Sequence, residues 1–378
     1  MTIDTSISDV GAPGRGKDAG GSGVAGRVPI DRGGMLVKVL VAGGAGFIGS
    51  TVSSALVDAG HTPVVLDSLV TGRREFCRGR PFRLADIADA DAVDDLLRRH
   101  PDIEAVVHCA ALIAVPDSVV RPVDYYRANV SATLEFVDRL LAHGIHRMIF
   151  SSSAAIYRPD VGLGVDETSA LEATSPYAQT KLVVERMLAD ISASSPLRVL
   201  SLRYFNPIGA DPAMRTGSQI ATPSHALGRL IQAHQAGVPF GVNGLDWPTR
   251  DGSALRDYVH VWDLAGAHLR ALERFDDLFA TGGAPHVCVN LGSGTGTTVL
   301  ELVAAFNAVV NRPVLVREAP RRPGDTPGAY ARGRRASALL GWRPQRDLAT
   351  GITDSLAWHH RRGQILTNLA PYHRLIAG

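Results

Sequence analysis

Between about residues 36 and 206 the chain alternates short apolar runs with segments of helical period. The apolar runs are rich in aliphatic and β-branched residues, as in TPVVLDS, AVVHCAAL and RVLSLRYF. The intervening segments, such as NVSATLEFVDRLLAHG, repeat their apolar residues every three or four positions, as an amphipathic helix does. Regular alternation of this kind predicts an α/β fold with a doubly wound parallel sheet, right-handed crossovers and helices on both faces.

A glycine-rich turn joins the first apolar run to the first helical segment. In GGAGFIGS, Gly43, Gly46 and Gly49 recur at the spacing GxxGxxG. Glycines let the backbone turn tightly and approach a diphosphate, and the following helix offers free N–H groups and the positive end of its dipole. The motif alone is weak, but its place on the first strand–helix turn predicts a Rossmann-type dinucleotide site.

Acidic positions downstream support this prediction and select the cofactor. Asp67 ends the second apolar run, 18 residues past Gly49, where a carboxylate can accept hydrogen bonds from an adenosine ribose. Asp86 and Ile87 end the third run, near the place expected for an adenine. A carboxylate at Asp67 repels a 2′-phosphate, which favours NAD over NADP.

A tyrosine and a lysine at helical spacing predict a catalytic pair. Tyr177 and Lys181 lie four residues apart in SPYAQTKLVVERML, on one face of the expected helix. Lys181 is one of only three lysines, against 36 arginines, so a lysine at this position indicates a specific role. An unperturbed tyrosine, with a pKa of about 10, is a poor base at neutral pH, and we expect the Lys181 ammonium and a bound nicotinamide to favour the phenolate. Ser153 ends the run RMIFSSS, at the carboxyl end of the expected strand, and we expect it to share a proton with Tyr177.

The chain has 378 residues, a length that fits about two domains. The pattern of apolar residues also changes along it. We predict an NAD-binding domain made of residues 35–206 together with about 256–290. A second, smaller α/β substrate-binding domain comprises residues 207–255 with about 291–378, where the strand–helix pattern loosens. Residues 1–34, with nine glycines and few apolar residues, predict a flexible tail.

The composition of the chain limits its expected cellular compartment and its expected binding partners. The formal net charge is only +2, which does not indicate a nucleic-acid binder. No stretch approaches the ~20 apolar residues of a membrane helix, and the N-terminus lacks the apolar core of a secretory signal. The three cysteines, Cys77, Cys109 and Cys288, lie far apart and form no CxxC pair, which predicts a reducing compartment and no metal site. We therefore expect a cytoplasmic protein with no nucleic-acid and no membrane partner.

Taken together, these segments give the chain a specific resemblance. From about residue 36 to 360 it resembles the UDP-glucose 4-epimerases of the extended short-chain dehydrogenase/reductase family, through GGAGFIGS, LDSLVTG, IFSSSAAIY, SPYAQTK, LRYFNPIGA, RDYVHVWDLA and APRRPGD. The resemblance implies hydride transfer from C4 of a UDP-sugar to a tightly bound NAD, and its return after the 4-keto sugar has rotated. Tyr177 would take the 4-hydroxyl proton with Ser153 as relay. A homodimer, formed through two helices of the first domain, is also implied.

The resemblance further implies which residues line the two ligand sites. Those expected at the cofactor are Gly43, Gly46, Phe47, Ile48, Gly49, Asp67, Ser68, Asp86, Ile87, Ala110, Ala111, Asn129, Tyr177, Lys181, Tyr204 and Phe205. Those expected at the substrate are Ser153, Tyr177, Asn206, Arg256, Arg322, Asp325 and Ala329. In this second set the two arginines match diphosphate contacts, and the Asp325 carboxylate can accept from ribose hydroxyls.

Several residues near the expected sugar pocket depart from the family pattern. Arg158 replaces a glycine after the SSSAxxY motif, and Ser224 and His225 stand where better-known members have paired asparagines. Ala329 occupies the position whose bulk governs acceptance of an N-acetyl group. The small side chain implies that UDP-N-acetylhexosamines fit as well as UDP-glucose and UDP-galactose.

Two other functions stay open at this point. A nucleotide-sugar 4,6-dehydratase would share the fold, NAD and the YxxxK pair, but it needs an acid and a base just after the serine-rich strand, where Ala154 and Ala155 stand. A non-catalytic NAD-binding protein would have little reason to keep Ser153, Tyr177 and Lys181 together.

Overall fold

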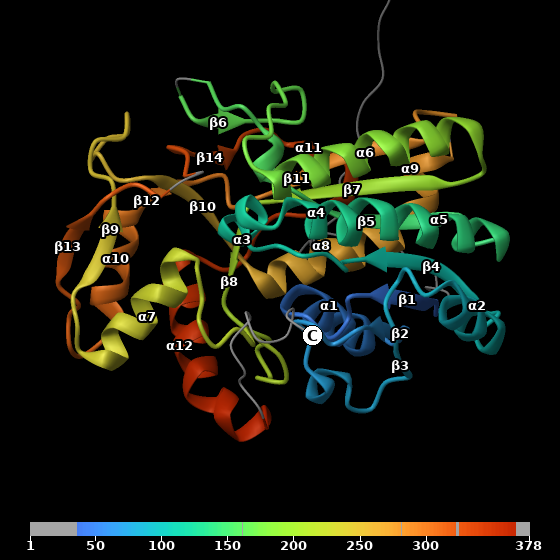
Figure 1. Ribbon diagram of the computed structural model, residues 1–378, viewed down its shortest axis with the longest axis horizontal. Helices are drawn as coiled ribbons and strands as arrows, with labels where there is room; N and C mark the ends of the chain where they lie inside the picture. The colour runs from blue at the N-terminus through green and yellow to red at the C-terminus, as the bar shows by residue number, and fades with distance from the viewer. Residues whose placement is uncertain (1–35, 161, 281, 323–324, 368–378) are drawn as a thin grey trace, which may run out of the picture. The chain divides into compact units, whose positions relative to one another are not determined.

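The computed structural model describes residues 36–160, 162–280, 282–322 and 325–367 (Figure 1). The tail predicted for residues 1–34 and the end of the predicted second domain, from residue 368, lie outside the described residues.

A seven-stranded parallel sheet forms the larger part of the fold. Its strands follow the spatial order β11-β7-β5-β4-β1-β2-β3. They are β1 (Lys38–Ala42), β2 (Thr62–Asp67), β3 (Phe82–Leu84), β4 (Ile103–His108), β5 (Arg147–Ser153), β7 (Arg198–Tyr204) and β11 (His286–Leu291). Every pairing between them is parallel, so the predicted doubly wound parallel sheet is confirmed.

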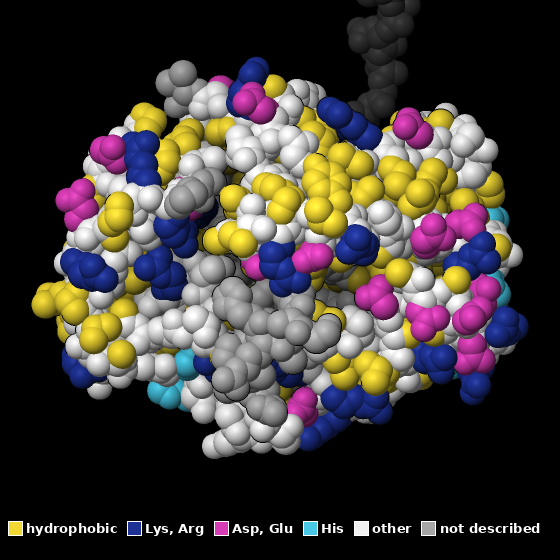
Figure 2. Space-filling view, viewed as in Figure 1, with side chains coloured by type: hydrophobic (Ala, Val, Ile, Leu, Met, Phe, Trp, Pro, Cys, Tyr) yellow, Lys and Arg dark blue, Asp and Glu magenta, His cyan; other side chains and the backbone are white. Residues whose placement is uncertain are grey.

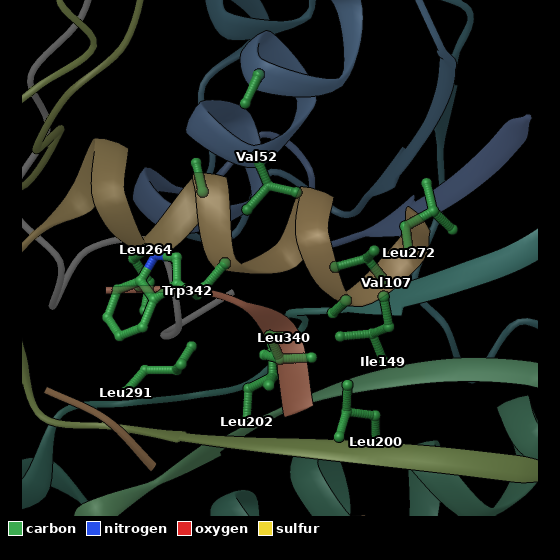
Figure 3. Close-up of a cluster of buried hydrophobic side chains, with 14 of the residues drawn as sticks. Val52, Val107, Ile149, Leu200, Leu202, Leu264, Leu272, Leu291, Leu340 and Trp342 are labelled. Atoms are coloured by element: carbon green, nitrogen blue, oxygen red, sulfur yellow. The ribbon is translucent and has the colours of Figure 1, made fainter. Parts of the chain in front are cut away.

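Helices cover both faces of this sheet because successive strand residues point to opposite sides. On β1, Val39 and Val41 pack into one apolar cluster and Leu40 into the other. The first cluster, shown in Figure 3, is built with α1 (Phe47–Asp58), α8 (Val261–Glu273), α9 (Phe275–Phe279) and α11 (Arg335–Leu340). The second is built with α2 (Ala90–Arg99), α5 (Ala132–Ala142) and α6 (Pro176–Ser194). Short helices α3 (Val115–Val120) and α4 (Pro122–Tyr126) and a π-helical turn, Arg127–Ser131, lie between β4 and α5.

A smaller part of the fold is built from short strands and three longer helices. One sheet has the order β12-β10-β14-β6, with β8 paired to β10, and β13 pairs with β9 in a further two-stranded sheet. These strands are β6 (Gly164–Val165), β8 (Asn206–Ile208), β9 (Phe240–Asn243), β10 (Leu255–His260), β12 (Gly296–Thr298), β13 (Val316–Ala319) and β14 (Gly328–Ala331). The helices are α7 (Ala226–Ala236), α10 (Val299–Val309) and α12 (Leu348–Ile365), and their apolar faces share one core with β9 and β10.

The strand order reverses between β1 and β4, which lie side by side at the centre of the large sheet. In doubly wound sheets the crevice outside the carboxyl ends at such a reversal is where ligands bind. The loops after the two strands are in close contact, since a Cβ added to Gly43 would lie 2.5 Å from the Ala110 nitrogen. Over the described ranges, no helix combines the length and the hydropathy that crossing a bilayer requires.

Candidate active site

The turn between β1 and α1 is shaped for a ligand that approaches the backbone. Gly43 has φ +77°, and a Cβ on Gly49 would lie 2.3 Å from the Gly43 carbonyl oxygen. Gly46, the N-cap of α1, has open space around it, because its added Cβ would meet only the Gly43 oxygen, at 3.4 Å. No side chain caps α1 and no acidic residue lies in its first turn. The first N–H groups of α1 therefore remain available for an anion such as the diphosphate of a dinucleotide.

Asp67 lies at the end of β2 beside this turn, as predicted. Its carboxylate accepts hydrogen bonds from the Ala45 nitrogen at 2.9 Å and from the Leu69 nitrogen at 2.8 Å. Burial raises the pKa of Asp67, and the nearby charge of Asp86 acts in the same direction. The carboxylate thus fixes the glycine turn, and each oxygen keeps a lone pair for a ribose hydroxyl. Asp86 lies two residues beyond the end of β3, not on the strand as we expected.

A buried asparagine links the cofactor side of the site to the catalytic helix. The Asn129 side chain is 2% exposed. Its oxygen accepts from the Leu112 nitrogen at 2.8 Å, and its amide donates to the Leu112 oxygen and to the Thr180 hydroxyl, each at 3.0 Å. Asn129 therefore holds the loop after β4, which includes Ala110 and Ala111, against α6.

The three predicted catalytic residues are brought together at the carboxyl end of β5. Ser153 is the last residue of β5, and Tyr177 lies in the first turn of α6, whose N-cap Ser175 accepts from the Ala178 nitrogen at 3.3 Å. The hydroxyls of Tyr177 and Ser153 share a hydrogen bond. One turn further on, the Lys181 Nζ donates to the Ser151 carbonyl oxygen at 2.8 Å and lies 4.8 Å from the centre of the Phe150 ring.

In the absence of ligand, the pKa values of Tyr177 and Lys181 do not shift in the direction that favours a phenolate. Burial raises the pKa of Tyr177, and the hydrogen bond with Ser153 opposes that change only in part. Burial also lowers the pKa of Lys181 to about 8. Burial therefore acts against the expected phenolate, and Lys181 is not among the groups that shift the pKa of Tyr177.

Tyr204 and Phe205, both predicted at the cofactor, point to different surroundings. The Tyr204 hydroxyl is hydrogen-bonded to Ser151, whose hydroxyl lies 3.0 Å from the Cys109 sulfur, and burial raises the pKa of Tyr204 well above its ordinary value. Phe205 instead packs in an apolar cluster that includes Tyr157 and Ala329. This cluster connects the end of β7 with β14.

The predicted substrate residues converge across β8, β10 and β14. Arg256 and Ala329 are register partners on β10 and β14, and the Asn206 amide donates to the Asp257 carbonyl oxygen at 3.1 Å. The Arg256 guanidinium donates to the Leu255 carbonyl oxygen at 2.6 Å and has no carboxylate partner among the described residues. A half-buried guanidinium that donates to carbonyl groups and has no carboxylate partner there keeps its charge for an anionic ligand.

Arg322 and Asp325 form an ion pair beside Arg256. The guanidinium donates to the carboxylate at 3.0 and 3.1 Å and to the Ser224 carbonyl oxygen at 3.1 Å. The charges of both residues act on Arg256 and also on Arg229 of α7. Figure 2 shows Lys and Arg side chains gathered at this end of the molecule, on the left of the view.

Sequence reasoning missed two residues of this site. Arg229 donates to the Asn243 side-chain oxygen at 2.7 Å and has no carboxylate partner in the described part of the chain. The buried Tyr258 hydroxyl has no hydrogen-bond partner among the described residues. Tyr258 could have been found from its position two residues after Arg256, because alternate strand residues share a face. No local pattern marks Arg229, which reaches the site only through the packing of α7.

The departures from the family pattern have mainly local partners. The Arg158 guanidinium forms an exposed ion pair with Glu172 at 3.0 Å. The His225 ring accepts from the Gly228 nitrogen at 3.1 Å and so caps α7, and burial lowers the pKa of His225 to about 4.

A dinucleotide turn at a sheet reversal, a Ser–Tyr–Lys cluster and an arginine-rich second site define a nucleotide-dependent sugar-modifying enzyme of the short-chain dehydrogenase/reductase type. Residues 39–284 match the NAD dependent epimerase/dehydratase family, and the chain belongs to this family. It is 42% identical over 329 residues to the UDP-glucose 4-epimerase of Rhizobium leguminosarum bv. trifolii, covering 86% of this chain and 98% of that one.

Solved structures give the same relationship. The UDP-glucose 4-epimerase of Stenotrophomonas maltophila, with bound NAD and formylated UDP-arabinopyranose, has a TM-score of 0.81 and 35% identity, covering 87% of this chain and 99% of that chain. The Brucella ovis enzyme, in complex with NAD, has a TM-score of 0.79 and 37% identity, covering 85% and 98%.

Proposed function

We propose that the chain is an NAD-dependent UDP-sugar 4-epimerase. The observation that carries this proposal is the convergence of Ser153, Tyr177 and Lys181 at the carboxyl end of β5, next to an uncapped helix N-terminus. The curated UDP-glucose 4-epimerase from Rhizobium leguminosarum bv. trifolii, of which the chain covers nearly the full length, supports the same reaction.

The residues present fit a bound NAD. The N–H groups of α1 would donate to its diphosphate, the Asp67 carboxylate would accept from its ribose hydroxyls, and Asn129 would order the loop beside it. Ser68, Asp86 and Ile87 would hold the adenosine half, and Tyr204 would lie beside the nicotinamide. When bound, NAD supplies a reversible hydride acceptor for C4 of the sugar.

The chain's own residues move the proton. Tyr177 accepts the proton of the sugar 4-hydroxyl, and Ser153, hydrogen-bonded to it, serves as the relay. The Lys181 ammonium, held by the Ser151 carbonyl, supplies positive charge beside the phenol and donors for ribose hydroxyls. The same two hydroxyls return the proton when the 4-keto sugar is reduced, so the base is regenerated in each turnover.

The positive charge of the second site supports a substrate that is bound through a nucleoside diphosphate group. Arg229, Arg256 and Arg322 face a single carboxylate, Asp325, which leaves two net positive charges. A nucleoside diphosphate sugar carries about two negative charges. Guanidinium groups match phosphate geometry, and holding the nucleotide leaves the sugar free to present either face at C4.

The range of sugars depends on the space beside β14. Ala329 packs against Phe205 and Tyr157 with a single methyl group. We propose that an N-acetyl group fits there, so that UDP-N-acetylhexosamines are substrates together with UDP-glucose and UDP-galactose.

Dehydration is disfavoured by the residues that follow Ser153. Ala154 and Ala155 form a short 3₁₀ helix at the place where an acid and a base would be needed to expel water. The test is therefore product analysis by NMR after the purified protein is incubated with UDP-galactose and no added NAD. UDP-glucose is the expected product; a keto-deoxy sugar would point to a dehydratase, and no turnover of UDP-hexoses, UDP-N-acetylhexosamines or UDP-uronates would overturn the proposal.

The ligand assignments place the two binding sites in different parts of the chain. We propose that residues 35–206 with about 256–290 bind NAD, and that residues 207–255 with about 291–378 bind the UDP-sugar. The glycine turn and Asp67 lie in the first part, and Arg229 and Arg322 lie in the second. Asn206 and Arg256, which are also assigned to the substrate, lie at the borders of the first part. We also propose a cytoplasmic location, since all three cysteines are free, as in a reducing compartment.

We further propose a homodimer formed through the α3–α5 side of the large sheet. Apolar side chains gather there on the face seen in Figure 2. The exposed ones are Val119, Val120, Val123, Tyr126 and Leu134, with exposures between 41% and 79%. A contiguous apolar face on helices is typical of a surface covered by a partner, and two copies can cover it mutually.

A further inference from the structure

A buried network of charged and polar groups lies directly behind the catalytic residues. Its centre is an ion pair between Glu185 of α6 and Arg203 of β7, whose exposures are only 3% and 4%. The Arg203 Nε lies 2.9 and 3.1 Å from the two carboxylate oxygens, and Nη2 lies 2.5 Å from one of them. The pairing is therefore bidentate, and it joins α6 to β7 where the helix crosses the large sheet (Figure 1).

The network extends from this pair to β5 and to the loop that follows it. The Ser152 hydroxyl donates to Glu185. Arg203 Nη1 donates to the Tyr157 hydroxyl at 2.8 Å, and Tyr157 donates to the Asn290 side-chain oxygen, also at 2.8 Å. Three parallel strands, β5, β7 and β11, are thus connected through one carboxylate and one guanidinium.

Members of the network are sequence neighbours of the residues assigned to the chemistry. Ser152 lies between Ser151, whose carbonyl oxygen binds Lys181, and Ser153. Arg203 precedes Tyr204, and Glu185 lies one helical turn after Lys181. Ser152 and Arg203 are thus directly bonded to residues of the site, and Glu185 is four residues from Lys181. A shift in the network would therefore move Ser153, Tyr204 and Lys181 through the backbone.

On the basis of the proposed function, we infer that Glu185 and Arg203 are positioning residues, which hold the ends of β5 and β7 against α6 and so fix Ser153, Tyr204 and Lys181 relative to Tyr177. Stability alone does not account for such a pair. Two buried charges lose their hydration, and a well-packed apolar replacement is often as stable or more stable. Precise geometry does account for it, because a misplacement of about 1 Å at reacting groups can reduce turnover by 10²-fold.

Glu185 also belongs to the electrostatic surroundings of Lys181. The groups that face the ammonium are the Ser151 carbonyl and Phe150 ring of β5, His108 at the end of β4, Cys109 after it, and Glu185 on its own helix. Burial lowers the pKa of Lys181 to about 8, and Cys109 and then the Glu185 carboxylate act in the opposite direction and raise it. Neutralising Glu185 leaves Arg203 unpaired nearby, and both changes favour loss of the lysine proton.

Three variants separate position from charge. Ser152→Ala removes one hydrogen bond and leaves the ion pair intact, so it is expected to fold. Glu185→Gln removes the charge. Ser192→Ala is the matched control, because Ser192 is a buried hydroxyl of the same helix whose one hydrogen-bond partner among the described residues is the Leu188 carbonyl oxygen. The readouts are kcat and KM for UDP-galactose, thermal unfolding, and the titration of each lysine by NMR of protein labelled with [6-¹³C]lysine; the chain has only three lysines, which makes the spectrum assignable.

The expected results differ for each variant. Ser152→Ala should reduce kcat at least fivefold with KM changed less than twofold and with the lysine titration unmoved. Glu185→Gln should reduce kcat further and move the Lys181 titration to lower pH. Ser192→Ala should match the parent protein in every measurement.

Specific outcomes overturn the inference. Parent-like kcat in Ser152→Ala, or an equal loss in Ser192→Ala, would reduce the network to a structural role. An unmoved Lys181 titration in Glu185→Gln would remove the electrostatic part, and if that variant does not fold, the kcat of Ser152→Ala decides alone. Absence of epimerisation by the parent protein would instead count against the proposed function, while the lysine titrations still report on the network.

Discussion

Replacing Gly46 with alanine is expected to separate cofactor binding from folding. Gly46 has φ −82° and ψ 175°, which alanine adopts without strain, and the added Cβ would meet only the Gly43 carbonyl oxygen, at 3.4 Å. Alanine is a poorer N-cap than glycine by up to about 1 kcal/mol. It also restricts the unfolded chain, which stabilises the fold by about 0.4–1 kcal/mol. The two effects nearly cancel, so the free energy of unfolding should change by less than about 1 kcal/mol.

Binding of NAD should suffer far more. The methyl group would be added at the N-cap itself, adjacent to the free N–H groups of α1, where the diphosphate is expected. Loss of one charge-assisted hydrogen bond costs about 1.5–3 kcal/mol, which corresponds to roughly 10- to 150-fold weaker binding. The assay is the NAD content of the purified protein, released by denaturation and quantified by chromatography, followed by calorimetric titration with NAD.

Two further glycines serve as controls. Gly49→Ala would place a Cβ 2.3 Å from the Gly43 oxygen, so it should destabilise the fold by about 1–3 kcal/mol as well as weaken NAD binding. Gly266→Ala, in the middle of α8 with no atom within 4 Å, should stabilise the protein by about 0.5–1 kcal/mol and leave NAD binding unchanged. If Gly46→Ala retained parent-like NAD affinity, the assignment of this turn to the cofactor would be refuted.

Four other substitutions test the remaining assignments. Tyr177→Phe should keep NAD bound and lower kcat by about 10²-fold or more, as loss of a general base does, and an unchanged rate would contradict the base assignment. Arg229→Gln should raise KM for UDP-galactose about tenfold with kcat unchanged, and a fall in kcat alone would place Arg229 outside the nucleotide site. Ala329→Tyr should abolish turnover of UDP-N-acetylglucosamine but not of UDP-galactose, measured side by side; equal turnover of both would count against the pocket at β14. Val120→Glu should convert a dimer to a monomer in sedimentation velocity, and a sedimentation coefficient that does not change would argue against the α3–α5 interface.

Local patterns were sufficient for the parts of the site that depend on one turn or one helix. The glycine turn follows from three glycines between a strand and a helix, and Tyr177 and Lys181 share a face because they are four residues apart. The strand end at Ser153 follows from an apolar run that stops at three serines. In each case the residues that determine the geometry are close in sequence.

Those local patterns did not predict contacts between residues that are distant in the sequence. Arg229 and Arg322 come from a helix and a loop 93 positions apart, and only the packing of α7 against β9 makes them neighbours. The bond between Asn129 and Thr180 crosses 51 positions. No sequence periodicity encodes such pairings, since either partner would look the same as an ordinary surface or core residue.

The protonation of the catalytic pair is the clearest case in which packing decided the outcome. Sequence spacing predicted that Tyr177 and Lys181 share one face of a helix, but it did not show that burial would act on both side chains. Burial raises the pKa of Tyr177 and lowers that of Lys181 to about 8, so each group favours its neutral form more than it would in water. Bringing a phenol from a pKa of about 10 to neutrality already requires about 4 kcal/mol of stabilisation, and burial adds to that requirement. Positive charge brought by a bound nicotinamide adds to that of the Lys181 ammonium, which links formation of the base to occupation of the dinucleotide turn. The Asn129–Thr180 bond and the Glu185–Arg203 pair are among the contacts that keep α6 in place for that coupling. The first ties the helix to the cofactor loop, and the second ties it to β7 and, through Ser152, to β5.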